Sequence, residues 1–146
     1  MFLTQSRRAA KPQSFLRNDM QENPLSQKII GAAIEVHRTL GGPGLLESVY
    51  EEALAWELQN QGLRIQRQAA IPITYKGHRL ADPLRLDLLV EELVIVEVKA
   101  VATYHTIFET QALTYLRLMN LRLALVINFG EKYVKDGVHR VVNNLQ

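Results

Sequence analysis

The sequence contains no cysteine among its 146 residues. This absence excludes disulfide bonds, thiolate nucleophiles, zinc–thiolate sites and iron–sulfur clusters, and it favours a protein of the reducing cytoplasm. Long hydrophobic runs are also missing, because no apolar stretch approaches the ~18 residues that a membrane-spanning helix requires. We therefore predict a cytoplasmic protein with no membrane partner.

The remaining composition is that of an ordinary globular protein. Hydrophobic residues make up 47% of the chain and charged residues 22%, which argues against extensive disorder. A chain of this length buries roughly 70% of its unfolded surface, enough for one hydrophobic core. We expect a single folded domain.

Positive charge is concentrated at the start of the chain. Residues 1–28 contain five basic and two acidic residues, whereas residues 29–146 contain 12 basic and 13 acidic ones. Because strong nucleic-acid binders usually present a basic face, any such face must be local. Residues 1–22 show no sustained hydrophobic period, so we predict a flexible basic tail over 1–22 and a folded domain over 23–146.

Hydrophobic periodicity and turn signals predict both helices and strands. Asn23 and Pro24 are typical of the first positions of a helix, and two glycines end that helix at 41–42. A second helix is expected from Pro43 to Gly62, and a third from Thr106, with Thr106 and Glu109 as a capping box. Strands are expected at residues 63–68, 71–75, 84–90, 93–99, 122–129 and 138–142. The order predicts an α/β fold in which helices flank a mixed sheet.

Several familiar catalytic motifs are absent. The sequence has no glycine–lysine phosphate loop and no GxGxxG segment after a strand. Its four histidines lie too far apart in the sequence for a zinc motif, and no serine occupies a nucleophile elbow. The candidate chemistry therefore lies in acidic residues and a lysine.

The strand at 93–99 is apolar except for Glu97 and Lys99, which share a face because side chains alternate along a strand. The preceding strand carries Asp87. Counting back through a tight turn at 91–92 places Asp87 beside Glu97. The sequence thus predicts two carboxylates and an ammonium group within a largely buried hairpin.

Two buried carboxylates require compensation, because an isolated buried charge costs several kcal/mol. One of them can hold a proton, Lys99 can neutralise part of the charge, or a divalent cation can bind. A structural ion pair between Lys99 and either Glu97 or Asp87 is the simplest alternative to a functional site. Oxygen ligands without histidine or cysteine favour Mg²⁺ or Mn²⁺.

A third carboxylate is a candidate on the second helix. Gly44, Glu47 and Tyr50 are three residues apart and lie on one helix face, and the helix dipole favours an ionised Glu47 in the first turn. From spacing alone, a solvated glutamate is the simpler interpretation.

The simpler interpretations of other polar residues are a core histidine for His37, packing for Tyr50 and Tyr115, a core amide for Gln111, and solvated charges for Glu35, Glu51 and Glu52.

The segment Gly44-Leu-Leu-Glu47-Ser-Val-Tyr50 resembles the signature of the GxxExxY proteins, a small prokaryotic family of the PD-(D/E)xK nuclease superfamily. Further segments of the chain resemble the same family: residues 29–37, 75–77, 87–90, 97–99 and 127–130, with Gln111 and residues 115–116. The resemblance covers roughly residues 25–142 and implies a restriction-endonuclease-like core.

The resemblance also implies roles for particular residues. Asp87, Glu97 and Lys99 match the superfamily's catalytic hairpin, Glu47 its helix acid, and Gln111 a polar residue of the following helix. Leu86 stands where the superfamily name has proline. The implied activity is hydrolysis of nucleic-acid phosphodiesters, with Mg²⁺ or Mn²⁺ held by Glu47, Asp87, Glu97 and the Val98 carbonyl. Lys99 would position or activate the attacking water, and Gln111 would orient that water or Lys99.

Two other functions remain open at the level of sequence. One is a catalytically silent module of the same fold that binds nucleic acid or protein, and the other is a hydrolase of a small phosphorylated substrate. A cluster of Lys76, Arg79 and Arg85 near the site would favour nucleic acid, whereas a closed pocket would favour a small substrate. The choice between DNA and RNA, and the presence of a homodimer, are also left open.

Overall fold

The computed structural model describes residues 13–145, and it describes side chains from Glu22 onward. Its centre is a five-stranded sheet in the order β2-β5-β6-β7-β8. The strands are β2 (Ile65–Ile71), β5 (Leu84–Val90), β6 (Val94–Lys99), β7 (Leu123–Asn128) and β8 (Val138–Val142). Within this sheet β6 and β7 pair in parallel and the other neighbours are antiparallel, which confirms the predicted mixed α/β fold.

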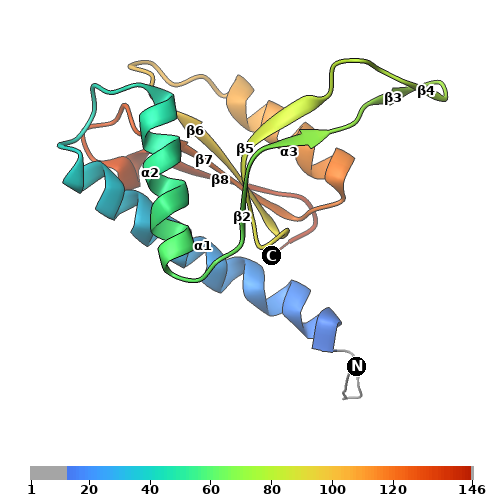
Figure 1. Ribbon diagram of the computed structural model, residues 1–146, viewed down its shortest axis with the longest axis horizontal. Helices are drawn as coiled ribbons and strands as arrows, with labels where there is room; N and C mark the ends of the chain where they lie inside the picture. The colour runs from blue at the N-terminus through green and yellow to red at the C-terminus, as the bar shows by residue number, and fades with distance from the viewer. Residues whose placement is uncertain (1–12, 146) are drawn as a thin grey trace.

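Three α-helices cover the two faces of the sheet (Figure 1). They are α1 (Gln13–Thr39), α2 (Glu47–Asn60) and α3 (Ile107–Met119). The first two pack on one face, against buried residues such as Val96 and Leu125. Helix α3 packs on the other face, against residues such as Ile95 and Val126, and it connects the parallel strands β6 and β7, as a parallel pair requires. A short 3₁₀ helix, η1 (Val134–Gly137), precedes β8.

The predicted helix start at Asn23 is wrong. Helix α1 begins ten residues earlier, at Gln13, and Pro24 lies inside it. Proline removes one backbone hydrogen bond from a helix, but Glu22 is buried and the Asn23 side chain accepts a hydrogen bond from Arg140 of β8. These contacts anchor the helical turn around Pro24 to the body of the domain. Of the segment predicted as a flexible tail, residues 1–12 lie outside the described residues and residues 13–22 belong to α1.

The predicted capping box at the start of α3 does not form. Thr106 has helical backbone angles, φ −65° and ψ −13°, and its side chain makes no capping hydrogen bond, because an N-cap residue needs an extended conformation to reach the free amides. The Glu109 carboxylate lies instead 3.6 Å from Nδ1 of His139 on β8. Glu109 thus faces the neighbouring strand.

A two-stranded arm projects from the body between β2 and β5 (Figure 1). It consists of β3 (Thr74–Tyr75) and β4 (His78–Arg79), joined by a turn at Lys76 and Gly77. The prediction of one strand over 71–75 is therefore wrong: Ile71 ends β2, and Pro72, which has no amide hydrogen to donate to a ladder, lies between the two strands.

Gly130 provides a test of how the loops beside the sheet are held. A Cβ atom at this position would lie 2.3 Å from the main-chain oxygen of Val101 and 2.8 Å from its nitrogen. We expect Gly130→Ala to lower the free energy of unfolding by about 1–3 kcal/mol or more, because backbone atoms cannot move aside cheaply. The matched control is Gly31→Ala, where a Cβ meets nothing within 4 Å and should stabilise α1 by up to about 1 kcal/mol. Urea unfolding of both variants measures the difference, and equal stability of Gly130→Ala and wild type would contradict the packing described.

Candidate active site

The alternation of side chains along β5 breaks at Asp87. Leu88 and Val90 pack with α1 and α2, whereas Leu86 packs on the α3 side, although residues two apart in a regular strand share a face. The position opposite Asp87 in β2 is Gln68, which has φ +52° and interrupts an otherwise continuous register. Both strands therefore distort here, and Asp87 lies at the distortion.

The pairing of β5 with β6 ends at the same level. The last paired residues are Leu88 and Val96. Beyond them, the Asp87 N–H donates to Oε2 of Glu97 at 3.0 Å, and the Val98 N–H donates to Oδ2 of Asp87 at 2.8 Å. Each carboxylate thus accepts a main-chain hydrogen bond across the opened strands. The structure places Asp87 beside Glu97, as the hairpin register predicts.

A glutamine and a glutamate that the sequence analysis did not select adjoin this pair. The Gln68 amide donates to Glu51 at 3.0 and 3.1 Å and to Oδ1 of Asp87 at 3.4 Å. Glu51 is only 6% exposed and also pairs with Arg67 at 3.3 Å, so its interpretation as a solvated charge is wrong. Its spacing of one helical turn from Glu47 is the signal that could have identified it.

Lys99 lies against an aromatic ring. Its Nζ is 4.5 Å from the centroid of Phe108 on α3, a distance at which the ring quadrupole attracts an ammonium group. No carboxylate of the described residues lies within the 4.0 Å of an ion pair with Lys99. The alternative of a structural ion pair with Glu97 or Asp87 is therefore not formed.

Glu47 lies near the end of β6 rather than between the two carboxylates. It is the exposed first residue of α2, and its Oε2 accepts a hydrogen bond from the Ala100 N–H at 3.3 Å. Among the side chains that the structure describes, from Glu22 to Leu145, no group of three or more His, Cys, Asp and Glu is arranged to hold a metal ion. The structure thus brings Asp87 and Glu97 together without Glu47 as a third member.

The other predicted site residues lie on both sides of the opened strands. The Val98 side chain is buried in the core, and its N–H binds Asp87. Gln111 is exposed on α3, one turn before Tyr115. Burial, and after it the charges of Glu97 and Asp87, raise the pKa of Tyr115. Tyr115 also packs against the core on the α3 side of the sheet, which agrees with its interpretation as a packing residue.

The carboxylate pair is electrostatically costly. Glu97 is 8% exposed, and its burial, followed by the negative charge of Asp87, raises the pKa of Glu97 to about 7. The hydrogen bond from the Asp87 amide and the positive charge of Lys99 act in the opposite direction. Near neutral pH, a bound cation would therefore compete with the proton for the Glu97 carboxylate.

We expect the metal-free protein to lose stability as the pH rises from about 4.5 to above 7. The raised pKa of Glu97 means that in this window the folded state holds more protons than the unfolded chain, so stability falls with increasing pH. Full ionisation should cost about 3 kcal/mol. Urea unfolding in EDTA between about pH 5 and pH 8 measures this loss.

The Glu97→Gln variant should flatten this pH dependence, because a neutral amide still accepts the Asp87 amide hydrogen without titrating. Glu92→Gln, which alters an exposed turn residue, controls for the removal of one surface carboxylate. Equal pH slopes for wild type and Glu97→Gln would contradict the assignment of the proton to Glu97.

The donor set fits a divalent cation. Asp87 and Glu97 supply adjacent carboxylates, and a cation would neutralise the repulsion that raises the pKa of Glu97. Magnesium is commonly held by one or two carboxylates, with water and substrate oxygens completing its coordination. A third protein carboxylate is thus not required for these residues to fit Mg²⁺ or Mn²⁺.

The tyrosine of the Gly44–Glu47–Tyr50 pattern is structural. Tyr50 is fully buried, its hydroxyl donates to the Gly42 carbonyl at 2.7 Å, and the Leu45 N–H donates to that hydroxyl at 3.2 Å. Gly44 has φ +116°, a conformation that favours glycine. These residues fix the loop before α2 and so determine where α2 begins, at Glu47.

The fold and the site together define a class of protein, an α/β domain with a restriction-endonuclease-like core whose central hairpin carries Asp87, Glu97 and Lys99. A family model described as the PD-(D/E)XK nuclease superfamily matches residues 23–141, and the chain belongs to this superfamily. No curated protein and no solved structure matches the chain. Over residues 13–145, no helix has the length and apolar character needed to cross a membrane.

Proposed function

We propose that the protein is a divalent-metal-dependent nuclease of the GxxExxY branch of its superfamily, acting in a prokaryotic cytoplasm. The observation that carries the proposal is the opened hairpin, where the Glu97 carboxylate accepts from the Asp87 N–H, the Asp87 carboxylate accepts from the Val98 N–H, and Lys99 lies two residues after Glu97. Superfamily membership supports nuclease chemistry, and the Gly44, Glu47 and Tyr50 pattern supports the branch.

Asp87 and Glu97 would hold Mg²⁺ or Mn²⁺, with the Val98 carbonyl as a further oxygen ligand. Glu47, which lies near the end of β6 and apart from this pair, would contribute an oxygen through a water molecule of the ion's shell. When bound, the cation lowers the pKa of a water molecule and offsets negative charge on the phosphate. Gln68 positions Asp87 by its 3.4 Å contact with Oδ1, and Glu51 in turn fixes the Gln68 amide.

Lys99 would donate hydrogen bonds to the scissile phosphate and to the attacking water, since an ammonium group carries three donors and no acceptor. Phe108 supports the lysine without neutralising it, so its full charge remains for the phosphate in the transition state. Gln111, exposed on α3, would orient the water or Lys99. Tyr115 would contribute a hydroxyl near both carboxylates.

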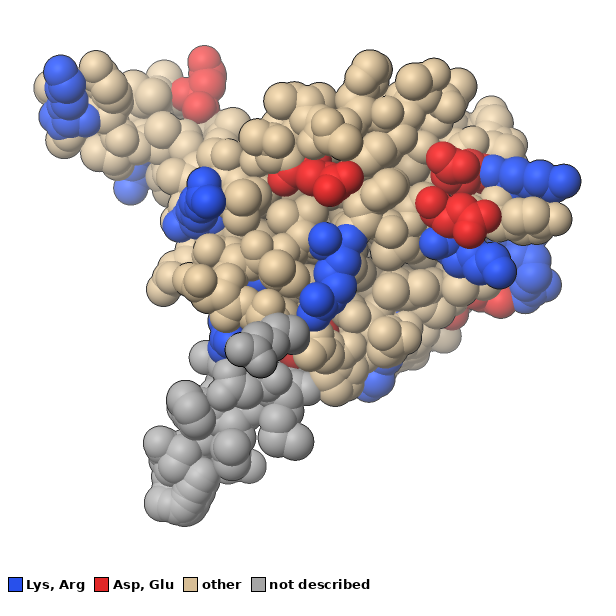
Figure 2. All heavy atoms as spheres, turned by 180° about the vertical axis from the view of Figure 1, so that it is seen from behind, with Lys and Arg blue, Asp and Glu red and all other residues tan. Residues whose placement is uncertain are grey.

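The arm favours nucleic acid as the substrate. Lys76 and Arg79 are exposed on it, and Figure 2 shows basic side chains at its tip, on the left of that view. Arg85, two residues before Asp87, donates to the Gln68 carbonyl at 3.2 Å. These residues supply local positive charge on the arm and on β5, which phosphate binding requires because the domain as a whole is not basic.

The decisive experiment is cleavage of single- and double-stranded DNA and RNA with Mg²⁺, with Mn²⁺ and with EDTA. We expect metal-dependent cleavage of at least one of these substrates. Binding without cleavage would favour the silent module, and hydrolysis confined to nucleotides or other small phosphate esters would favour the small-substrate enzyme. Lys76→Ala with Arg79→Ala should weaken nucleic-acid cleavage and leave hydrolysis of a small phosphodiester unchanged.

A further inference from the structure

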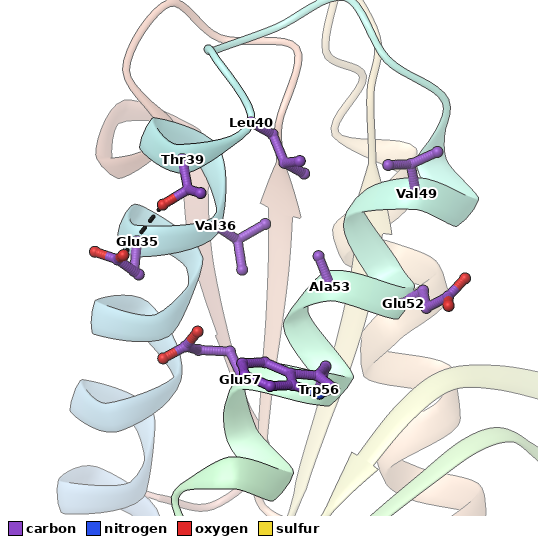
Figure 3. Close-up of a pocket in the computed structure, with 9 residues that line it drawn as sticks. All are labelled: Glu35, Val36, Thr39, Leu40, Val49, Glu52, Ala53, Trp56 and Glu57. Carbon is purple, nitrogen blue, oxygen red and sulfur yellow. Dashed lines mark hydrogen bonds between the residues drawn. The ribbon is translucent and has the colours of Figure 1, made fainter.

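A groove lies between α1 and α2, formed by residues that the proposed nuclease chemistry does not use (Figure 3). Its volume is about 670 Å³. The lining residues are Glu35, Val36, Thr39, Leu40, Val49, Glu52, Ala53, Trp56 and Glu57. Trp56, the only tryptophan of the chain, is 62% exposed there. An exposed indole in a groove that also contains Leu40 and Val49 is an apolar surface suited to a partner's side chain.

The charged residues of the groove are all acidic. Glu35 is paired with Arg38 at 2.5 Å and accepts a hydrogen bond from Thr39 at 3.1 Å. Glu52 and Glu57 have no such partner among the described residues. An occupant of this groove should therefore combine an apolar anchor with positive charge.

The chain itself contains a segment of this chemistry. Residues 1–12 carry Arg7, Arg8 and Lys11, no acidic residue, and the apolar pair Phe2 and Leu3. This segment matches the groove in both respects: its basic residues complement Glu52 and Glu57, and its apolar end can fill the surface beside Trp56.

The basic residues of the segment fall short of the groove in their own molecule. Helix α1 begins at Gln13, and the groove begins at Glu35, ~33 Å further along the helix at 1.5 Å per residue. Arg8 is five residues from Gln13, so the extended chain carries it at most ~18 Å from the helix start. The main chain at Arg8 therefore ends ~15 Å short of Glu35 in the same molecule, which favours contacts with the groove of another molecule.

We propose that the groove is a self-association site that binds residues 1–12 of a second copy of this chain. Two copies related by a two-fold axis would make the contact twice, each inserting its segment into the other's groove. Phe2 or Leu3 would cover Trp56, and Arg7 and Arg8 would pair with Glu52 and Glu57.

The test is a charge exchange in the full chain, followed by light scattering over a concentration series at low salt. Arg7→Glu with Arg8→Glu, and separately Glu52→Lys with Glu57→Lys, should each weaken dimerisation by about tenfold or more, because a symmetric dimer contains the repulsive contact twice. A chain with all four substitutions should dimerise again. The substituted groove positions lie on the helix surface, and circular dichroism checks that each variant folds.

Trp56 fluorescence provides an independent readout, since it is the only tryptophan. Its emission should shift to shorter wavelength as the dimer forms, and the shift should be lost in each two-substitution variant. A wild-type chain that stays monomeric at every concentration would overturn the proposal, as would a dimer insensitive to both reversals or a four-substitution chain that fails to recover. A change in Trp56 emission on reversing Arg7 and Arg8 in a monomer would show that the segment acts within one molecule, and would equally overturn it.

Discussion

The Lys99→Met variant is expected to fold, to bind Mn²⁺ and to lose phosphodiester cleavage. Removal of a group that transfers or positions a proton commonly costs ~10²–10⁴ in rate. The stability should change by less than about 1 kcal/mol, because a thioether also packs well against the Phe108 ring. A structural Lys99–Glu97 ion pair would instead predict a loss of ~3–5 kcal/mol if it were buried.

The matched control for this variant is Lys132→Met. Lys132 also lies over an aromatic ring, with its Nζ 5.4 Å from the Tyr133 centroid, so the substitution reproduces the loss of a cation–π contact away from the hairpin. Cleavage, unfolding and calorimetric Mn²⁺ titration are measured for both variants. Wild-type cleavage by Lys99→Met, or failure of that variant to fold with Mg²⁺ present, would contradict the catalytic role.

The Asp87→Asn variant is expected to lose most of its Mn²⁺ affinity and its cleavage activity while the metal-free protein becomes no less stable. An asparagine oxygen can still accept the Val98 amide hydrogen that Asp87 accepts at 2.8 Å, and the substitution loses only the long 3.4 Å contact with the Gln68 amide. The substitution also removes a negative charge that raises the pKa of Glu97. A residue retained for metal binding at a cost in stability should behave in this way.

Calorimetric Mn²⁺ titration and urea unfolding in EDTA, carried out near pH 8 where Glu97 is mostly ionised, measure the two effects. Asp82→Asn is the control, because Asp82 is an exposed aspartate of the loop before β5. Equal Mn²⁺ affinity in Asp87→Asn and wild type would rule out Asp87 as a ligand. A large loss of stability without metal would instead show that its role is structural.

The register of the central hairpin could be predicted because a strand has a strict two-residue period. That period placed Glu97 and Lys99 on one face, and the turn length placed Asp87 opposite Glu97. The apolar runs likewise predicted β5 and β8 with the bounds that the structure shows. Local patterns such as these depend on few distant contacts.

Predictions from short sequence motifs were wrong where a contact with a residue distant in the sequence determined the conformation. Asn23 and Pro24 resemble a helix start, yet Arg140 from the far end of the chain holds Asn23 within α1. Glu109 resembles a capping residue, yet it faces His139. Glu51 resembles a solvated charge, yet Arg67 and Gln68 bind it at the sheet edge.

The sequence by itself determined the α/β class, the hairpin with its two carboxylates, and the absence of cysteine chemistry, because these follow from residue type and period. The tertiary structure decided how the site is built. It opened β5 from β6 so that side chains replace main-chain acceptors, it brought Gln68 and Glu51 from other elements to Asp87, and it placed Lys99 over Phe108. These contacts join residues between 9 and 19 positions apart in the sequence. The helix and strand periods determine only which side chains of one element share a face, so they do not determine which side chains of different elements come into contact when helices pack on the sheet.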